Sequence, residues 1–257
     1  MEELIRIIYN NYKKPHIVKE DFIYDVCEIF SKYYELEKYF KDVVIINAKT
    51  PSLAYYSPQL KTIYVNIYKL IKTTGYYIAQ NEIISIYEEK ILAVNLYILK
   101  VLLHEIEHIV QERIIRDGQE NIEKKILIAS FNNEQNLKDN KEYSNKKYYT
   151  NPIERQAEIK SLNQINRIAN ETNNETVFRF FERELLITAM NDYEIGESIN
   201  VYPYQYFFNN YKKEIIKDIE EIQMLKDNYD LRIQLGLAIS HREYNVLKRK
   251  LIINWKE

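Results

Sequence analysis

Apolar residues recur at helical spacing along most of the chain. The pattern predicts amphipathic helices over residues 2–13 and 20–40, with a break at Pro15 between them. A longer periodic stretch covers residues 83–115 and ends near Gly118, either as one helix or as two with a bend. The first half of the chain is therefore expected to be mainly helical.

The second half continues with helical periodicity after a polar interruption. Residues 119–131 are helical in pattern, whereas residues 132–150 are rich in lysine and asparagine and nearly devoid of aliphatic side chains. That composition predicts an exposed loop. Further helices are expected over residues 152–170, 175–191, 208–226 and 240–252.

Two short segments have the pattern of strands. Val43–Ile46 is apolar and β-branched, and Thr62–Asn66 alternates between its two sides. The residues between them, 51–58, form a turn-rich ribbon with a proline at each end. We therefore predict an α+β fold that is predominantly helical, with a small sheet near residues 43–66. Because neither an internal repeat nor a linker is visible, we expect residues 1–257 to form one domain.

The composition is that of an ordinary globular protein. The chain has 257 residues, of which 46% are hydrophobic and 29% charged, and its formal net charge is -2. Basic and acidic residues are interspersed, so no broad basic surface is expected and nucleic-acid binding is disfavoured. Binding of nucleic acid by the lysine-rich loop 132–150 is the alternative, but this loop also carries Glu134, Asp139 and Glu142 and lacks arginine.

The expected location follows from three features that the sequence lacks, namely a pair of cysteines, a secretory signal and a segment that could span a membrane. Cys27 is the single cysteine, which excludes an intramolecular disulfide and a cysteine-based zinc cluster. The first residues are acidic and amphipathic, without the basic start and apolar stretch of a secretory signal. No apolar run approaches the length that spans a bilayer. We expect a cytoplasmic protein without a membrane partner.

The segment His104-Glu105-Ile106-Glu107-His108 carries the chemistry. It has the form HExxH and lies within the periodic stretch 83–115. Residues four apart share one helix face, so both imidazoles can bind one zinc ion and leave room for a third ligand and a water. Glu105, next to the first ligand, is placed to take a proton from that water. The alternative is a charged surface helix, which the apolar flanking residues disfavour because buried unpaired His and Glu are costly.

A third metal ligand has to come from elsewhere in the chain. His16 and His241 are candidates, but Glu154 and Glu158 fit better, because they lie four residues apart at the start of the helix that Asn151 and Pro152 are expected to begin. One carboxylate can bind zinc while the other accepts the free N–H of a ligand histidine. The alternative is a solvated helix start whose acidic residues interact with the helix dipole.

These two motifs resemble those of the gluzincins, the metalloproteases to which thermolysin belongs. Glu154 and Ala157 match the ExxA second motif of the minimal zincins of phages and integrative elements, the repressor-cleaving ImmA type. The resemblance implies a zincin-like fold with a small sheet beside the HExxH helix, and zinc held by His104, His108 and Glu154. A thermolysin-like motif would have aspartate at Glu158, so the resemblance supports the role of Glu158 less strongly.

The same resemblance implies two further features of a peptidase cleft. The strand with Ile63, Tyr64 and Val65 would border the cleft as an edge strand and hold an extended substrate by strand addition; an ordinary strand of a small sheet is the alternative. A donor to the developing oxyanion is also expected. Four residues are candidates between which the sequence does not choose: His241, Tyr244, Tyr148 and Tyr149.

The sequence thus supports a zinc-dependent peptidase. It would bind one zinc per chain and cleave a protein or peptide substrate by metal-activated water, with Glu105 as the general base. The alternative is a catalytically idle zincin-fold protein of a mobile element that binds or inhibits a partner through residues 132–150 and its many tyrosines.

Overall fold

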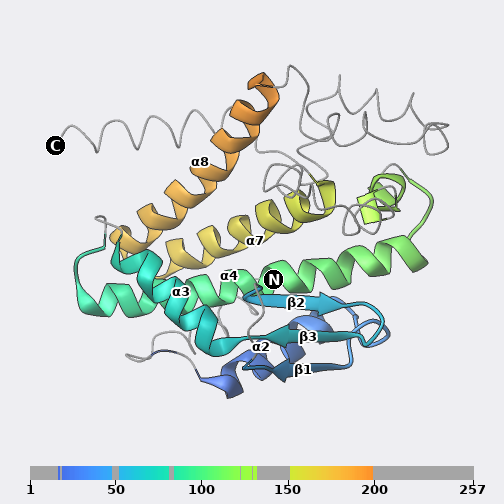
Figure 1. Cartoon of the computed structure of the whole chain (residues 1–257), viewed down its shortest axis with the longest axis horizontal. Coiled ribbons are helices and arrows are strands. Elements are labelled where there is room, and N and C mark those ends of the chain that lie inside the picture. Colours follow the sequence, from blue (N-terminus) through green and yellow to red (C-terminus); the bar gives the residue numbers. More distant parts are fainter. Residues whose placement is uncertain are drawn as a thin grey trace. The chain divides into compact units, whose positions relative to one another are not determined.

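The computed structural model describes residues 17, 19–47, 52–80, 84–121, 123–128, 130–131 and 151–198 (Figure 1). The chain divides into two compact units. The first unit comprises Met1–Arg113 and Ser161–Glu182, and the second comprises Ile114–Lys160 and Arg183–Glu257. The described part is mostly helical with a small three-stranded sheet, as predicted. The expected organisation as one domain stays a prediction, as do the features expected within residues 2–13, 132–150, 208–226 and 240–252, which lie outside the described residues.

The sheet belongs to the first unit and has three strands. They are β1 (Asp42–Ile45), β2 (Ala54–Ser57) and β3 (Thr62–Val65), in the order β1-β3-β2. β3 runs parallel to β1 and antiparallel to β2. The two strands predicted from β-branched residues are therefore confirmed, and the ribbon between them contributes a third strand.

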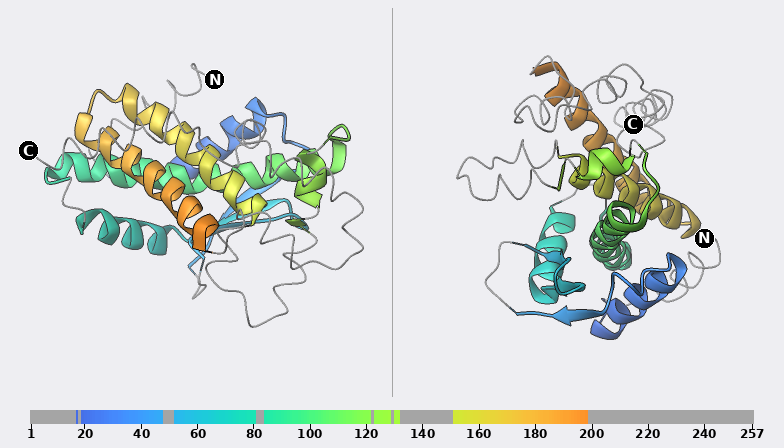
Figure 2. Two further views of the ribbon diagram at one scale, coloured as in Figure 1. Left: turned by 90° about the horizontal axis from the view of Figure 1, so that it is seen from above. Right: turned by 90° about the vertical axis from the view of Figure 1, so that its right-hand side faces the viewer.

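The prediction of an edge strand at Ile63, Tyr64 and Val65 is wrong. These residues lie in β3, which is the central strand and pairs with β1 on one side and β2 on the other. Because both neighbours use its backbone groups, β3 has no edge to offer a substrate. The edges of the described sheet are β1 and β2, and β2 is the strand next to α4 (Tyr87–Asp117) in Figures 1 and 2.

Two shorter helices flank this sheet in the sequence. α2 (Glu20–Tyr33) buries one apolar stripe that includes Ile23, Val26 and Phe30. It ends before the predicted residue 40, because Glu35 adopts a positive φ of 53° that a helix does not accommodate. α3 (Ile67–Ala79), which sequence reasoning missed, begins directly after β3, and the side chain of Asn66 accepts the Lys69 N–H as its cap.

α4 is a single continuous helix of 31 residues, so the periodic stretch forms one helix rather than two. It is buried on nearly all sides around the HExxH segment, where Leu102 to Glu107 are all buried. A helix buried all round lies in the core of its fold. The polar side chains that it carries must find partners inside the protein, because burial without a partner is costly.

The second unit contains the last residues of α4, the helical residues 123–128, the start of α7 (Pro152–Glu171) and the end of α8 (Glu175–Ser198). The predicted cap of α7 is confirmed: the side chain of Asn151 accepts the Ile153 N–H at 3.1 Å, and Pro152 is the first helical residue. α7 continues without a break from Lys160 in the second unit into Ser161 in the first.

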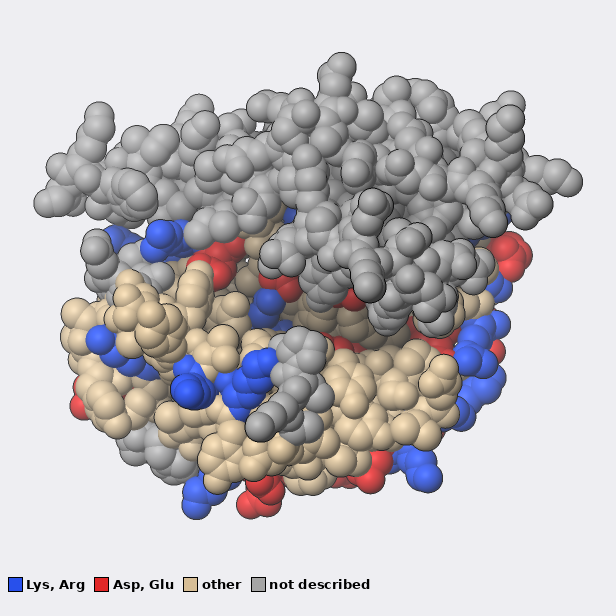
Figure 3. Space-filling view, viewed as in Figure 1, with Lys and Arg blue, Asp and Glu red and all other residues tan. Residues whose placement is uncertain are grey.

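Basic and acidic side chains of the described residues both occur across the face drawn in Figure 3. No helix in the described part of the chain combines the length and hydropathy that crossing a membrane requires.

Candidate metal centre

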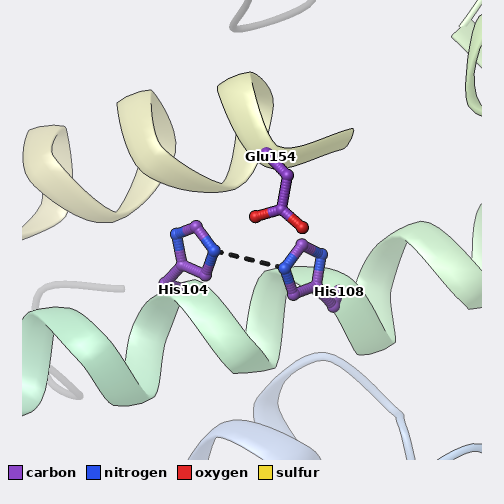
Figure 4. A group of neighbouring side chains, drawn as sticks. All are labelled: His104, His108 and Glu154. Atoms are coloured by element: carbon purple, nitrogen blue, oxygen red, sulfur yellow. Dashed lines mark hydrogen bonds between the residues drawn. The ribbon is translucent and has the colours of Figure 1, made fainter. Parts of the chain in front are cut away.

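His104 and His108 lie one turn apart on α4, and their imidazoles converge. The two Nε2 atoms are 3.2 Å apart, and the ring planes meet at 85° (Figure 4). His104 is buried and His108 is half-buried. Two nitrogen lone pairs at this distance repel each other, so the pair requires either a proton or a cation between the two atoms.

The spacing of the two nitrogens fits a zinc ion. In a tetrahedral site each histidine nitrogen lies about 2.0–2.1 Å from zinc, which places two ligand nitrogens about 3.3 Å apart. The Nε2 atoms, at 3.2 Å, already have this separation. The two side chains would therefore need little rearrangement to share one ion.

Glu154 is the third residue of this cluster. It lies in the first turn of α7, and its side chain is largely buried, with 8% of the residue exposed. Figure 4 draws its carboxylate pointing toward the two imidazoles. One ligand atom from each of His104, His108 and Glu154 lies within 4.8 Å of the other two. Since about 3.3 Å separates ligands in a tetrahedral site, at least one ligand atom would move by up to about 1.5 Å on binding.

His108 has a hydrogen-bond partner on its other ring nitrogen. Its Nδ1 lies 2.8 Å from Oε1 of Gln111, one turn further along α4. Sequence reasoning sought such a partner in Glu158, whose role stays a prediction, and missed Gln111. The signal was present, because residues three apart on a helix face each other.

Glu105 contacts the sheet. Its Oε2 accepts the backbone N–H of Tyr56 in β2 at 2.9 Å, and the residue is only 7% exposed. In an antiparallel pair, the N–H and C=O of one residue point to the same side of the strand. Both Tyr56 groups therefore point away from β3, and the outer edge of β2 faces the HExxH helix.

The Tyr56 side chain makes a second link between β2 and α4. Its hydroxyl contacts the carboxylate of Glu112 and lies 2.7 Å from the backbone carbonyl of Tyr39. Tyr56 thus bonds to α4 at two points, Glu105 and Glu112, which are seven residues or about two turns apart. No sequence motif marks Tyr56, because these partners are distant in sequence.

The negative charge of Glu105 affects the neighbouring thiol of Cys27. Burial raises the pKa of the Cys27 thiol, and the negative charge of Glu105 raises this pKa further. Cys27 is therefore a protonated thiol. It is one of the buried residues of α2 and lies near Glu105 of the HExxH segment.

The remaining predicted residues are outside this geometry. His16, His241, Tyr244, Tyr148 and Tyr149 lie outside the described residues, so they stay candidates. Comparison of the chain with protein-family models, with curated proteins and with solved structures finds no match. The sequence motifs and the geometry of the cluster are therefore the features that bear on function.

Proposed function

We propose that this protein is a zinc-dependent peptidase that hydrolyses peptide bonds of a protein substrate. His104, His108 and Glu154 would hold one zinc ion, and Glu105 would act as the general base. The observation that carries the proposal is the convergence of the two Nε2 atoms at 3.2 Å beside a buried carboxylate. Two imidazoles and one carboxylate are a donor set of catalytic zinc sites, in which a fourth position stays open.

The donor set fits zinc by its charge as well as by its spacing. Two neutral imidazoles and one carboxylate carry a single negative charge, so the complex with a divalent cation keeps a net positive charge. When bound, zinc lowers the pKa of a coordinated water to about 7 and polarises the substrate carbonyl. The remaining tasks of the reaction fall to residues of the chain.

Glu105 is the residue that we assign to proton transfer. It follows His104 directly in the chain, and its Oε2 accepts the Tyr56 N–H, which orders the carboxylate. Glu105 would accept a proton from the attacking water and deliver it to the amine nitrogen when the peptide bond breaks. An ordered carboxylate matters here, because general-base catalysis depends on hydrogen-bond distance to the proton that is removed.

The test compares Glu105→Gln with Glu107→Gln, a matched change of a second buried carboxylate on the same helix. Zinc-loaded proteins are incubated with a denatured protein mixture, and new peptide ends are detected by mass spectrometry. We expect Glu105→Gln to keep its zinc and lose hydrolysis by about 10²–10⁴-fold, while Glu107→Gln stays active. Undiminished cleavage by Glu105→Gln would overturn the assigned base.

The absence of cleavage by zinc-loaded wild type would instead favour the alternative expected from the sequence, an idle zincin-fold binding or inhibitory protein. The cytoplasmic location expected from the sequence stays a prediction in either case.

A further inference from the structure

We infer that Gln111 is a positioning residue of the metal centre, which holds His108 in the one tautomer that presents Nε2 to an ion. The inference rests on the proposed zinc site. Its observation is the 2.8 Å contact between Gln111 Oε1 and His108 Nδ1. Gln111 is only 2% exposed, so bulk water has little access to replace its amide as the partner.

The tautomer matters because a neutral imidazole carries only one ring proton. A nitrogen that holds this proton has no lone pair for a metal. An acceptor at Nδ1 keeps the proton there, so Nε2 of His108 retains its lone pair toward His104. Without this acceptor, the proton can occupy Nε2, and the ion must first displace it.

The placement of Gln111 follows from helix geometry alone. His104, His108 and Gln111 are spaced four and three residues apart, so all three lie on one stripe of α4. Because both residues lie on one helix, the backbone positions of His108 and Gln111 are fixed relative to each other. This distinguishes Gln111 from Glu158, which would have to reach a histidine from α7.

The amide is also suited by its lack of charge. Glu105 and Glu154 are buried carboxylates on or beside the proposed site. A third anion at Nδ1 of His108 would add to their mutual repulsion. Glutamine supplies the acceptor oxygen and leaves the charge of the donor set unchanged.

The experiment uses two variants of the full chain. Gln111→Met keeps the approximate side-chain volume and removes the acceptor, whereas Gln111→Glu keeps an acceptor oxygen. Gln164→Met is the control, because Gln164 donates to the Tyr34 hydroxyl rather than to a histidine. Zinc affinity is measured by competition with a chelator, and the tautomer of His108 by imidazole nitrogen shifts in metal-free protein.

We expect wild-type His108 to carry its proton on Nδ1. In Gln111→Met the Nε2-protonated form should appear and zinc should bind about 10–100-fold more weakly, the usual cost of losing such a partner. Gln111→Glu, which still has an acceptor oxygen, should carry the proton on Nδ1 of His108 as wild type does. Gln164→Met should match wild type. The inference is overturned if wild-type His108 is protonated on Nε2, or if Gln111→Met changes neither the tautomer nor the zinc affinity.

These readouts separate the two proposals. If wild type binds no zinc, the proposed function fails, while the nitrogen shifts still decide whether Gln111 sets the tautomer. If wild type binds zinc and Gln111→Met binds it equally well, only the role of Gln111 fails.

Discussion

Removing the Tyr56 hydroxyl should loosen the connection between β2 and α4. In Tyr56→Phe the ring and the backbone N–H to Glu105 remain, but the hydroxyl contacts with Glu112 and with the Tyr39 carbonyl are lost. Glu112 is a buried residue, 8% exposed, so its carboxylate loses a hydrogen bond that water does not readily replace. Hydrogen bonds to charged groups contribute about 1.5–3 kcal/mol.

We therefore expect Tyr56→Phe to lower the free energy of unfolding by about 1.5–3 kcal/mol, measured by urea denaturation at neutral pH. Tyr55→Phe is the matched control on the same strand. Tyr55 is 39% exposed, and its ring stacks on that of Tyr64, a contact that phenylalanine retains. Its substitution should change the free energy of unfolding by no more than about 0.5 kcal/mol.

The same variant reports on Glu105. If the hydroxyl contacts hold β2 in place, their loss in Tyr56→Phe leaves the Tyr56 N–H less well fixed against Glu105. Hydrolysis by this variant should then fall while zinc binding is retained. Equal stability of Tyr56→Phe and Tyr55→Phe would refute the reasoning, because it would mean that the hydroxyl contacts do not join β2 to α4.

Two further predictions concern titrating groups in the first unit. The raised pKa of Cys27 should make its thiol unreactive toward a disulfide reagent at pH 8 in native protein and reactive after unfolding; equal rates in both states would contradict the burial. Burial beside Glu107 raises the pKa of Tyr34 to about 12 from an ordinary value of 10.0. Between about pH 10 and 12 the unfolded chain loses the Tyr34 proton while the folded chain keeps it, so the free energy of unfolding should fall as the pH rises through this range. Urea titrations should show a smaller fall in Tyr34→Phe.

The sequence was informative wherever the contacts are local. The HExxH spacing predicts the convergence of two imidazoles because residues four apart share a helix face. The cap at Asn151 was readable for the same reason, since its partner lies two residues away. Gln111 follows the same rule at three residues and was within reach of sequence reasoning.

Contacts between distant segments were not readable. The hydrogen bond from Tyr56 to Glu105 spans 49 residues and that to Glu112 spans 56, and tyrosine has no motif that marks such a role. The segment that forms β2 was interpreted as a turn-rich ribbon, so the sequence predicted two strands, and the resemblance to the zincins assigned the edge to the strand that is in fact central. A strand can be recognised as central only when both of its neighbours in the sheet are known.

The end of α2 shows a different limit. Leu36 and Tyr39 are buried and continue the apolar spacing of the helix, so the periodicity extends past its true end at Tyr33. A turn can bury residues at a spacing that a helix also produces. Burial therefore explains the pattern, but the pattern alone does not distinguish the two conformations.

Zinc per chain in purified protein tests the central claim most directly, with Glu154→Ala measured beside Glu171→Ala, an exposed glutamate on the same helix. We predict about one zinc per chain in wild type and in Glu171→Ala, and much less in Glu154→Ala, because two imidazoles alone leave the site one protein ligand short. Folded wild type without zinc after supplementation, or Glu154→Ala with as much zinc as Glu171→Ala, would contradict the proposed centre.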